Sequence, residues 1–522
     1  MTWNVQLITL RFAIAQLPCI FVASIKSISS LFFNQKTKIM TQLSKLLVTL
    51  LVKLITLLLV LNSFESIAQG RRTSVSVRDN GKTTISIKNG LGNNFAIEYK
   101  GEITLSDDDT DVVAISDGGY MEIKKAAFGS RRRISIEPDN SGKLIKKYYV
   151  GSSQRNFDAE GRKWLSEILL EVVRTTTLGS EKRVNRLYKQ GGAYKVLTEV
   201  DKISSNHVKS RYIKLLLNKK LSEKDLLRVL DEVDHIDSDH HRASILKENT
   251  AAFLAYEATT GAYIRTTGGI DSDHHKASVL KRSIDDGNIS DTQMKTLFAI
   301  ADDIDSDHHK ASVLQTVLSH RSLNGNTLKL LLNTSRNIDS DHHKASVLKS
   351  TLKFAKLDNS TYNTLLSAAT NLDSDHHMAS VFRTMLKKNI DPASLSYMLQ
   401  LVGEEINSDS HSANVLKEVV WKQKVADGAL KSMLNAMEHM SSDVHRADVF
   451  KQLARKTFTE KETANILNAI ADIDSDFHKA ESLLAFSYRV ENMGDTAKEA
   501  YIGTCKTIDS ESHFGRAIRG IQ

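Results

Sequence analysis

Proline and cysteine are the residues of which this chain has least. Its 522 residues include three prolines and two cysteines. Because proline interrupts helices, its near absence permits long helical stretches. The cysteines are Cys19 and Cys505, so loss of an N-terminal segment that contains Cys19 would leave no intrachain disulfide. Cys505 lies among ordinary helical residues, where we expect a position in the core.

Motifs of catalysis are also lacking. The sequence has no glycine-rich phosphate loop, no nucleophile-elbow motif, no paired-cysteine metal site and no His-Glu-x-x-His zinc motif. A catalytic site is normally unique in a chain, whereas the serine and aspartate clusters of this chain recur in a repeat. We therefore predict that the protein is not an enzyme and uses no cofactor.

Charge of one sign is not concentrated anywhere along the chain. The formal net charge is +8, and residues 1–68 contribute +5 of it, which leaves about +3 for the rest. Nucleic-acid binding rewards a concentrated basic face, so the composition argues against that partner. With 41% apolar and 25% charged residues, the chain is predicted to be folded.

A single long hydrophobic run lies near the N-terminus. Leu46–Leu61 is almost entirely apolar, follows Lys45, and precedes Ser66-Ile67-Ala68, which offers small residues for a signal peptidase. We predict a signal peptide over 40–68, with an uncleaved membrane anchor as the alternative. Residues 1–39 are then either an extension upstream of the true start, Met40, or an additional membrane segment. The protein is thus expected to be exported, periplasmic or extracellular, and to meet a membrane only through this segment.

Residues 70–157 alternate apolar and polar side chains, with turn signals between the alternating stretches. Thr83–Ile87, Phe95–Tyr99 and Arg133–Ile136 are typical of strands, and Asp79-Asn80-Gly81 is typical of a hairpin turn. We predict a β-rich head, either a small antiparallel sandwich or a curled sheet. Within it we interpret Asp107–Asp109 as a solvated turn rather than a calcium loop, and Arg131–Arg133 as an exposed strand edge.

From Asp158 the spacing becomes helical. Trp164, Leu165, Ile168 and Leu169 form an apolar stripe, so residues 158–202 are predicted to be helices that cap the following array and join it to the head.

A repeat dominates residues 203–522. It is clearest as Ile270-Asp271-Ser272-Asp273-His274-His275-Lys276-Ala277-Ser278-Val279-Leu280, and its leading apolar residue returns at intervals of 33–35 residues. Each unit reads as two helices: Ser272 or Asp271 caps the first, and a break such as Asp286–Asn288 precedes the second. The fold class is therefore α+β and multidomain, with a small antiparallel β head followed by an α-solenoid of about ten 34-residue helical hairpins.

Residues 70–522 resemble a family of bacterial envelope proteins. Its members pair a short β domain and a segment like Asp158-Ala159-Glu160-Gly161-Arg162-Lys163-Trp164-Leu165 with helical repeats that begin Ile-Ser-Ser-Asp. In some relatives this module follows a sensor-type membrane metallopeptidase, whose zinc motif this chain lacks. The resemblance implies an envelope location and allows a regulatory module that works with such a peptidase, but it carries over no activity.

Fifteen of the 18 histidines lie in the repeat motif, at two adjacent positions. The first position tolerates serine, valine or phenylalanine in later units, so we interpret it as partly buried packing. The second position stands three residues after the serine cap, where a neutral imidazole could accept a hydrogen bond from the backbone in the manner of a capping box.

Two functional interpretations of the histidines remain beside the structural one. Metal binding would use an aspartate and the histidines of one unit, the candidates being Asp271, His274, His275, Asp305, His308, His309, Asp339, His342 and His343. Equivalent histidines of stacked units should lie roughly 8 to 10 Å apart, which leaves each ion with too few ligands for tight binding. Alternatively, protonation of histidines at many helix starts would loosen the array at acidic pH. The sequence favours a non-enzymatic binding or scaffolding protein with a protein or peptide partner.

Overall fold

The computed structural model describes residues 72–77, 82–89, 93–127, 129–286 and 289–522. The chain divides into two compact units, Met1–Gly179 and Ser180–Gln522. The predicted signal peptide and the segment before it lie outside the described residues. No helix in the described ranges is both long and apolar enough to cross a membrane.

The first unit contains a seven-stranded antiparallel sheet with the order β1-β2-β3-β6-β7-β8-β9. Between β3 and β6 the chain makes a separate two-stranded hairpin, β4-β5. The predicted β head is confirmed, and it is one sheet rather than a sandwich. The strands are β1 (Arg72–Val77), β2 (Lys82–Asn89), β3 (Asn93–Lys100), β4 (Ile103–Leu105), β5 (Val112–Ile115), β6 (Tyr120–Ala127), β7 (Ser130–Pro138), β8 (Leu144–Val150) and β9 (Ser153–Arg155).

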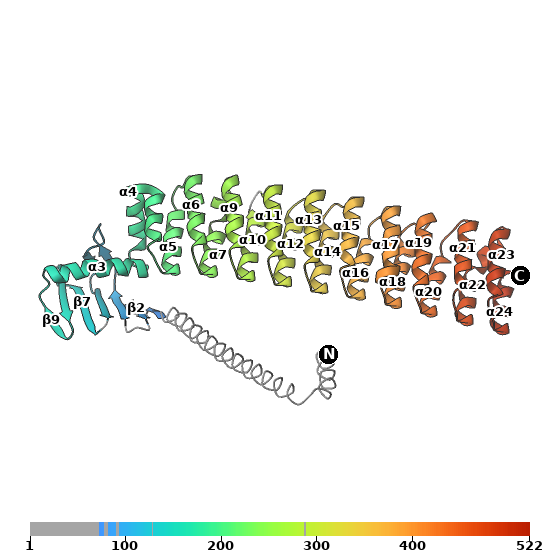
Figure 1. Ribbon diagram of the computed structural model, residues 1–522, viewed down its shortest axis with the longest axis horizontal. Helices are drawn as coiled ribbons and strands as arrows, with labels where there is room; N and C mark the ends of the chain where they lie inside the picture. The colour runs from blue at the N-terminus through green and yellow to red at the C-terminus, as the bar shows by residue number, and fades with distance from the viewer. Residues whose placement is uncertain (1–71, 78–81, 90–92, 128, 287–288) are drawn as a thin grey trace, which may run out of the picture. The chain divides into compact units, whose positions relative to one another are not determined.

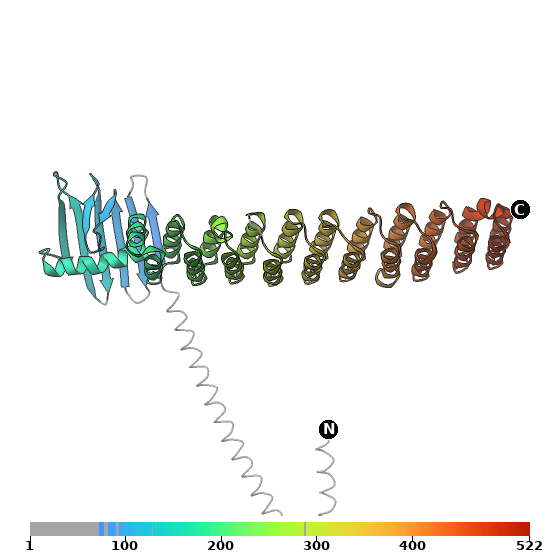
Figure 2. The ribbon, with the colours of Figure 1, turned by 90° about the horizontal axis from the view of Figure 1, so that it is seen from above.

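One face of the sheet packs against helix α3 (Ala159–Thr175), which Figure 2 shows running across the strands. Alternate strand residues such as Ile97, Ile123 and Ile134 are buried together with Leu165 and Ile168 of the helix. The expectation that 158–202 forms one capping segment is therefore wrong for α3, because its apolar stripe completes the core of the head. A helical stripe in a sequence does not say which core it faces.

The arginine run of the head is also placed differently from our expectation. Arg131–Arg133 belongs to β7, which pairs with β6 on one side and β8 on the other, so it is not an edge strand. On the face opposite α3, the Arg133 guanidinium lies 3.2 Å from Glu122 and 3.9 Å from the centre of the Tyr149 ring. Partners on neighbouring strands, rather than exposure, account for this arginine.

The acidic triplet of the head contains a tight turn, in which Asp107 and Asp108 are exposed as predicted, whereas Asp109 is buried rather than solvated. The Asp108 carboxylate accepts hydrogen bonds from the hydroxyls of Ser106 (2.6 Å) and Thr110 (2.7 Å) and from the Thr110 backbone (3.1 Å). Hydrogen bonds to the charged form lower the pKa of Asp108 to about 2.

The second unit is a helical array in two layers, visible as two rows of helices in Figure 1. Helices that begin with the repeat motif form one layer, and the second helix of each unit forms the other. The motif helices are α5 (Asn206–Leu217), α7 (Asp239–Glu248), α10 (Asp273–Asp286), α12 (Asp307–His320), α14 (Asp341–Phe354), α16 (Asp375–Met385), α18 (Asp409–Lys422), α20 (Asp443–Leu453), α22 (Asp476–Glu491) and α24 (Glu511–Ile518).

The second layer contains α6 (Glu223–Asp234), α9 (Glu257–Gly268), α11 (Asp291–Asp302), α13 (Gly325–Arg336), α15 (Asn359–Ala369), α17 (Pro392–Glu405), α19 (Asp427–Glu438), α21 (Glu460–Ile470) and α23 (Asp495–Cys505). A short helix, α8 (Thr250–Phe253), precedes α9, and the 3-10 turn η2 (Arg519–Ile521) follows α24. The predicted solenoid is confirmed with nine complete hairpins, and the tenth motif carries only α24 and η2.

The core of the array follows the repeat. All ten leading apolar residues are buried: Ile203, Ile236, Ile270, Ile304, Ile338, Leu372, Ile406, Met440, Ile473 and Ile508. Ala277 and Leu280 of the motif helix are buried with them. Cys505 is buried too, as expected, and burial raises its thiol pKa to about 11.

The open start of the array is covered by α4 (Ser180–Val200), which packs beside α5. Val184, Val196 and Val200 join the continuous core of the following hairpins. The helix kinks at Gly191 and Gly192, and Gly192 has φ = 63°, a conformation that favours glycine. Within the second unit, α4 therefore supplies the helical cover that was predicted for the first hairpin.

Candidate functional site: the motif helices and a groove between α19 and α21

From α7 onward, the second aspartate of the motif joins each unit to the next. Asp273, the first residue of α10, accepts a hydrogen bond on Oδ2 from the backbone N–H of Ser306, which precedes α12, at 2.7 Å. The same bond recurs with lengths of 2.6 to 2.8 Å between successive units. The pairs are Asp239–Ser272, Asp273–Ser306, Asp307–Ser340, Asp341–Ser374, Asp375–Ser408, Asp409–Ser442, Asp443–Ser475 and Asp476–Ser510.

This bond corrects our interpretation of the serine cap. Ser340 stands at the N-cap of α14, but its side chain makes no capping hydrogen bond, and the same holds for the described N-cap serines of α7, α12, α16, α18, α20, α22 and α24. From α12 onward, each of these serines instead contributes its backbone N–H, which donates a hydrogen bond to the aspartate of the preceding unit. In the motif layer, the predicted side-chain cap is present at Ser205 of α5, which accepts from the Val208 backbone. Other side-chain caps occur in the second layer, as at Ser222, Ser290 and Thr459.

A buried cation on the same helices holds the two helices of a hairpin together. Lys276 lies three residues after Asp273, one turn further along α10, and its Nζ is 3.0 Å from the Asp303 carboxylate at the end of α11. Lys310, Lys344 and Lys479 donate to the backbone carbonyls of Asn337, Asn371 and Thr507 at 2.7 to 3.0 Å. A cation at the C-terminal end of a helix meets the negative end of its dipole. One helix therefore anchors the linker to the next unit at two points.

The motif histidines form a continuous chain of rings along the array. The first histidine of one unit packs against the second histidine of the next unit, and both pack against their own neighbour in sequence. Ring centres in contact are 5.2 to 6.1 Å apart through twelve imidazoles, from α5 to α18. In chain order of contact they are His207, His241, His240, His275, His274, His309, His308, His343, His342, His377, His376 and His411. We call this set the histidine ladder.

The first histidine position is exposed, so the expectation that it is partly buried is wrong. His274 and His308, at the first position, are exposed, whereas His275 and His309, at the second, are half-buried. The second histidine does not complete a capping box either, because the N-cap backbone donor of its helix is bound by the aspartate of the preceding unit. What both positions share is the ring contact between units.

The environment of the second position disfavours its charged form. Burial, followed by the charge of adjacent histidines, lowers the pKa of His275, His309 and His377 below the ordinary value. For His241, burial again comes first. The aspartate of the preceding unit opposes the shift at His275 and His309.

The candidate metal ligands fall into two groups. Asp271, Asp305 and Asp339 are exposed, and the structure gathers no set of three His, Cys, Asp or Glu side chains suited to an ion within the described ranges. The histidine candidates, in contrast, do meet. His274 contacts both His275 and His309, and His308 contacts His309 and His343, while His342 contacts His343.

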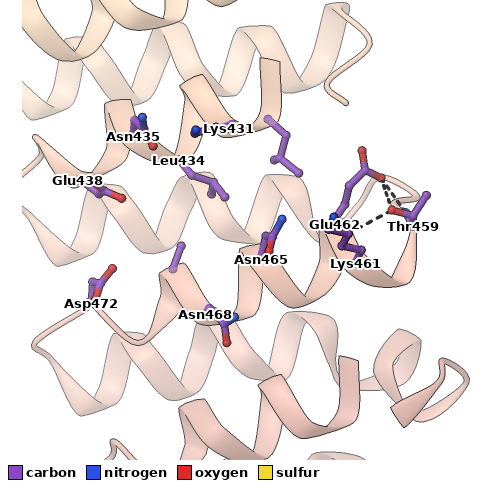
Figure 3. A pocket seen from close by; sticks show the side chains of 12 residues that line it. Lys431, Leu434, Asn435, Glu438, Thr459, Lys461, Glu462, Asn465, Asn468 and Asp472 are labelled. Carbon is purple, nitrogen blue, oxygen red and sulfur yellow. Dashed lines mark hydrogen bonds between the residues drawn. The ribbon is translucent and has the colours of Figure 1, made fainter. Parts of the chain in front are cut away.

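A groove of about 610 Å³ opens between α19 and α21 in the second layer. Figure 3 shows its polarity: Glu438 and Asp472 lie at one end, the three amides between the ends, and Lys461 toward the other end. The amides are Asn435, Asn465 and Asn468, all exposed, and Leu430, Leu434 and Ala469 add apolar surface. Thr459 and Glu462 at the rim are engaged with each other in a capping box.

Uneven packing of the second layer makes room for this groove. Gly403 of α17 lies so close to α19 that an added Cβ would stand 2.9 Å from the Cα of Ala436. The pairs α17–α19 and α21–α23 pack closely, whereas α19 and α21 make fewer close approaches. The sequence did not predict the groove: Asn435 and Asn468 lie five residues before a leading apolar residue, but Asn333 does too and does not line it.

Comparisons with known proteins identify no family. No protein-family model matches the sequence, and no curated protein is significantly similar to it. Among solved structures, a crystal structure of an exomer cargo adaptor complex matches over 77% of this chain and 84% of its own, with 10% identity and a TM-score of 0.17. A likeness at that score carries no functional inference.

Proposed function

We propose that this protein is a non-enzymatic, exported scaffold of the cell envelope that binds an extended segment of another protein in the groove between α19 and α21. The observation that carries the proposal is the row of three exposed asparagines across the groove. In the described part of the chain, Asn435, Asn465 and Asn468 make no side-chain hydrogen bond to the protein, so their amides face solvent.

Asparagine amides suit an extended peptide because each can donate and accept at once. A peptide in a groove leaves alternating backbone N–H and C=O groups that need such partners. The leucines beside the amides would cover apolar side chains of the peptide. A solenoid supports this role because its hairpins hold equivalent side chains at a regular spacing on one rigid surface.

The charges at the groove ends favour one direction of the bound segment. Lys461 lies in the first turn of α21, where the helix dipole adds positive potential, and Lys431 lies in the N-terminal half of α19. Glu438 and Asp472 lie at the opposite ends. An acidic residue of the partner is therefore expected beside the lysines and a basic residue beside the carboxylates.

Site-specific photo-crosslinking in living cells tests the groove. A photoreactive amino acid at Asn468 should give a discrete adduct, and one at Asn333 should not. Asn333 is an exposed asparagine at the same repeat position in α13 and does not line this groove, so it is a matched control. The adduct at position 468 should weaken when Asn435→Ala is added. Identical adduct patterns at the two positions would contradict the proposal.

Export is tested separately by fractionating cells and sequencing the N-terminus of the mature protein. We expect the protein in the envelope fraction with Gln69 as its first residue. Recovery in the cytoplasm with residues 40–68 intact would refute export while leaving the groove proposal standing.

A further inference from the structure

The histidine ladder removes the objection that spacing raised against metal binding. Equivalent histidines of adjacent units were expected too far apart to share an ion. In the structure, the neighbours across a unit boundary are non-equivalent: the first histidine of one unit faces the second histidine of the next. Their ring centres are 5.5 to 6.1 Å apart.

This separation matches two imidazoles on one ion. A metal–nitrogen bond of ~2.0–2.1 Å puts two ring centres roughly 4.5 Å apart for adjacent ligands and roughly 6.4 Å apart for opposite ligands. The observed distances lie between these limits. Rotation about the side-chain torsions of two partly exposed rings is therefore sufficient to aim both nitrogens at one point.

We propose that each of six inter-unit histidine pairs binds one divalent copper or nickel ion, so that the first half of the array is a ladder of two-histidine metal sites. The pairs are His207/His241, His240/His275, His274/His309, His308/His343, His342/His377 and His376/His411. This inference does not depend on the groove between α19 and α21, which lies in the other layer and in later units.

The local charges allow such binding but limit its strength. Asp239 and Asp273 add negative charge near His275 and His309, which favours a bound cation. Lys247 and Lys281 oppose a cation at the same two histidines. We expect micromolar rather than structural affinity.

Copper and nickel are preferred to zinc because of the ligand count. Structural zinc takes four protein ligands, and each pair supplies two. Copper(II) and nickel(II) accept tetragonal sites with nitrogen ligands and water at the remaining positions, and both stand high in the general order of affinity.

Each ion would join two units, so binding should stiffen the ladder half of the array. The later motifs provide an internal contrast, because Ser410, Val444, Phe477 and Ser512 replace the first histidine there. His445, His478 and His513 therefore face no imidazole of the preceding unit.

Titration calorimetry and copper electron paramagnetic resonance of the chain as the cell processes it, without a polyhistidine tag, test the proposal. We expect six copper ions per chain, two nitrogen ligands per ion, and a higher melting temperature that a chelator reverses. The triple variant His274→Ser, His308→Ser, His342→Ser should bind three ions. The control double variant His445→Val, His513→Val should bind six ions. The array itself carries serine at the first histidine position and valine at the second in other units, so both variants use residues that the fold accepts.

The ends of the ladder decide which histidines pair. His207 and His411 each contact a single imidazole, in the neighbouring unit. Under the proposal, His207→Ser and His411→Val each remove one ion. Five ions, unchanged by either substitution, would mean that sequence neighbours such as His274 and His275 bind the metal, and the proposal would be overturned. Binding of one ion or none would overturn it as well.

Discussion

The aspartate bond between units gives the sharpest prediction about stability. Asp341→Ala removes the carboxylate that accepts a hydrogen bond from the Ser374 backbone at 2.7 Å and leaves that half-buried donor without its partner. A hydrogen bond to a charged group contributes about 1.5–3 kcal/mol, and a negative charge in the first turn of a helix about 0.3–1 kcal/mol. The free energy of unfolding should therefore fall by about 2–4 kcal/mol.

Neighbouring substitutions provide the controls. Ser340→Ala should lower the free energy of unfolding by less than about 0.5 kcal/mol, instead of the ~1 kcal/mol of an ordinary N-cap, because its hydroxyl caps nothing. Asp341→Asn keeps an acceptor oxygen but loses the charge, and should cost about 1 kcal/mol. Asp339→Ala removes an exposed side chain and should be nearly neutral.

Urea unfolding measured by circular dichroism gives the total change, and hydrogen exchange at the Ser374 amide reports the bond itself. In a repeat array, weakening one interface can also split the transition, so the two measurements are best read together. The reasoning fails if Ser340→Ala costs as much as Asp341→Ala, or if Asp341→Ala leaves the Ser374 amide fully protected.

Three further substitutions and conditions test other parts of the structure. Trp164→Ala should destabilise the head by about 3–5 kcal/mol, because the buried indole fills the space between α3 and the sheet; thermal melting of the head checks this. Lys344→Met should change the free energy of unfolding by less than about 1.5 kcal/mol, because Met378 fills the equivalent position one unit later, whereas Lys344→Ala should cost at least about 2 kcal/mol. The melting temperature should fall when the pH is lowered from 7.5 to 5.5. In the folded state, the pKa values of four ladder histidines are lowered from 6.5; they are His241, His275, His309 and His377. The stability that these neutral rings give is therefore complete above pH 6.5 and is lost as the pH falls through their lowered pKa values. Replacing these four by valine should reduce that fall, and a melting temperature equal at both pH values would refute the sign.

The repeat period was predictable because burial repeats with it. Ile270 and its equivalents are buried at the junctions between hairpins and must therefore be apolar. Their spacing defines the hairpins even when the contacts between units are not known. The strands of the head were likewise predictable from alternation, since Ile134 and Ile136 face α3 and Ser135 between them does not.

The relations between units were not predictable in the same way. Serine and aspartate are both good N-caps, so the sequence favours a local cap at Ser272, and only the stacking of hairpins brings Asp239 to its backbone donor. The stacking of hairpins also brings His240 into contact with His275 rather than with its equivalent, His274. The sequence analysis considered only the distance between equivalent histidines and therefore did not predict this contact. Arg133 was misjudged because a charge run does not reveal that strands lie on both sides of it.

The bonds by which a motif helix holds the linker that follows it give the array a direction. Asp273 and Lys276 hold the entrance to α12, and both leave the ribosome before the segment that they hold. When a new motif helix forms, the aspartate carboxylate that accepts its N-cap hydrogen bond therefore already belongs to a folded unit. The solenoid is suited to folding unit by unit from its N-terminal end during synthesis. Deletion of units from the C-terminus leaves the bonds to the remaining linkers intact. Deletion of units from the N-terminus removes the motif helix that holds the first remaining linker, so that linker loses its bond.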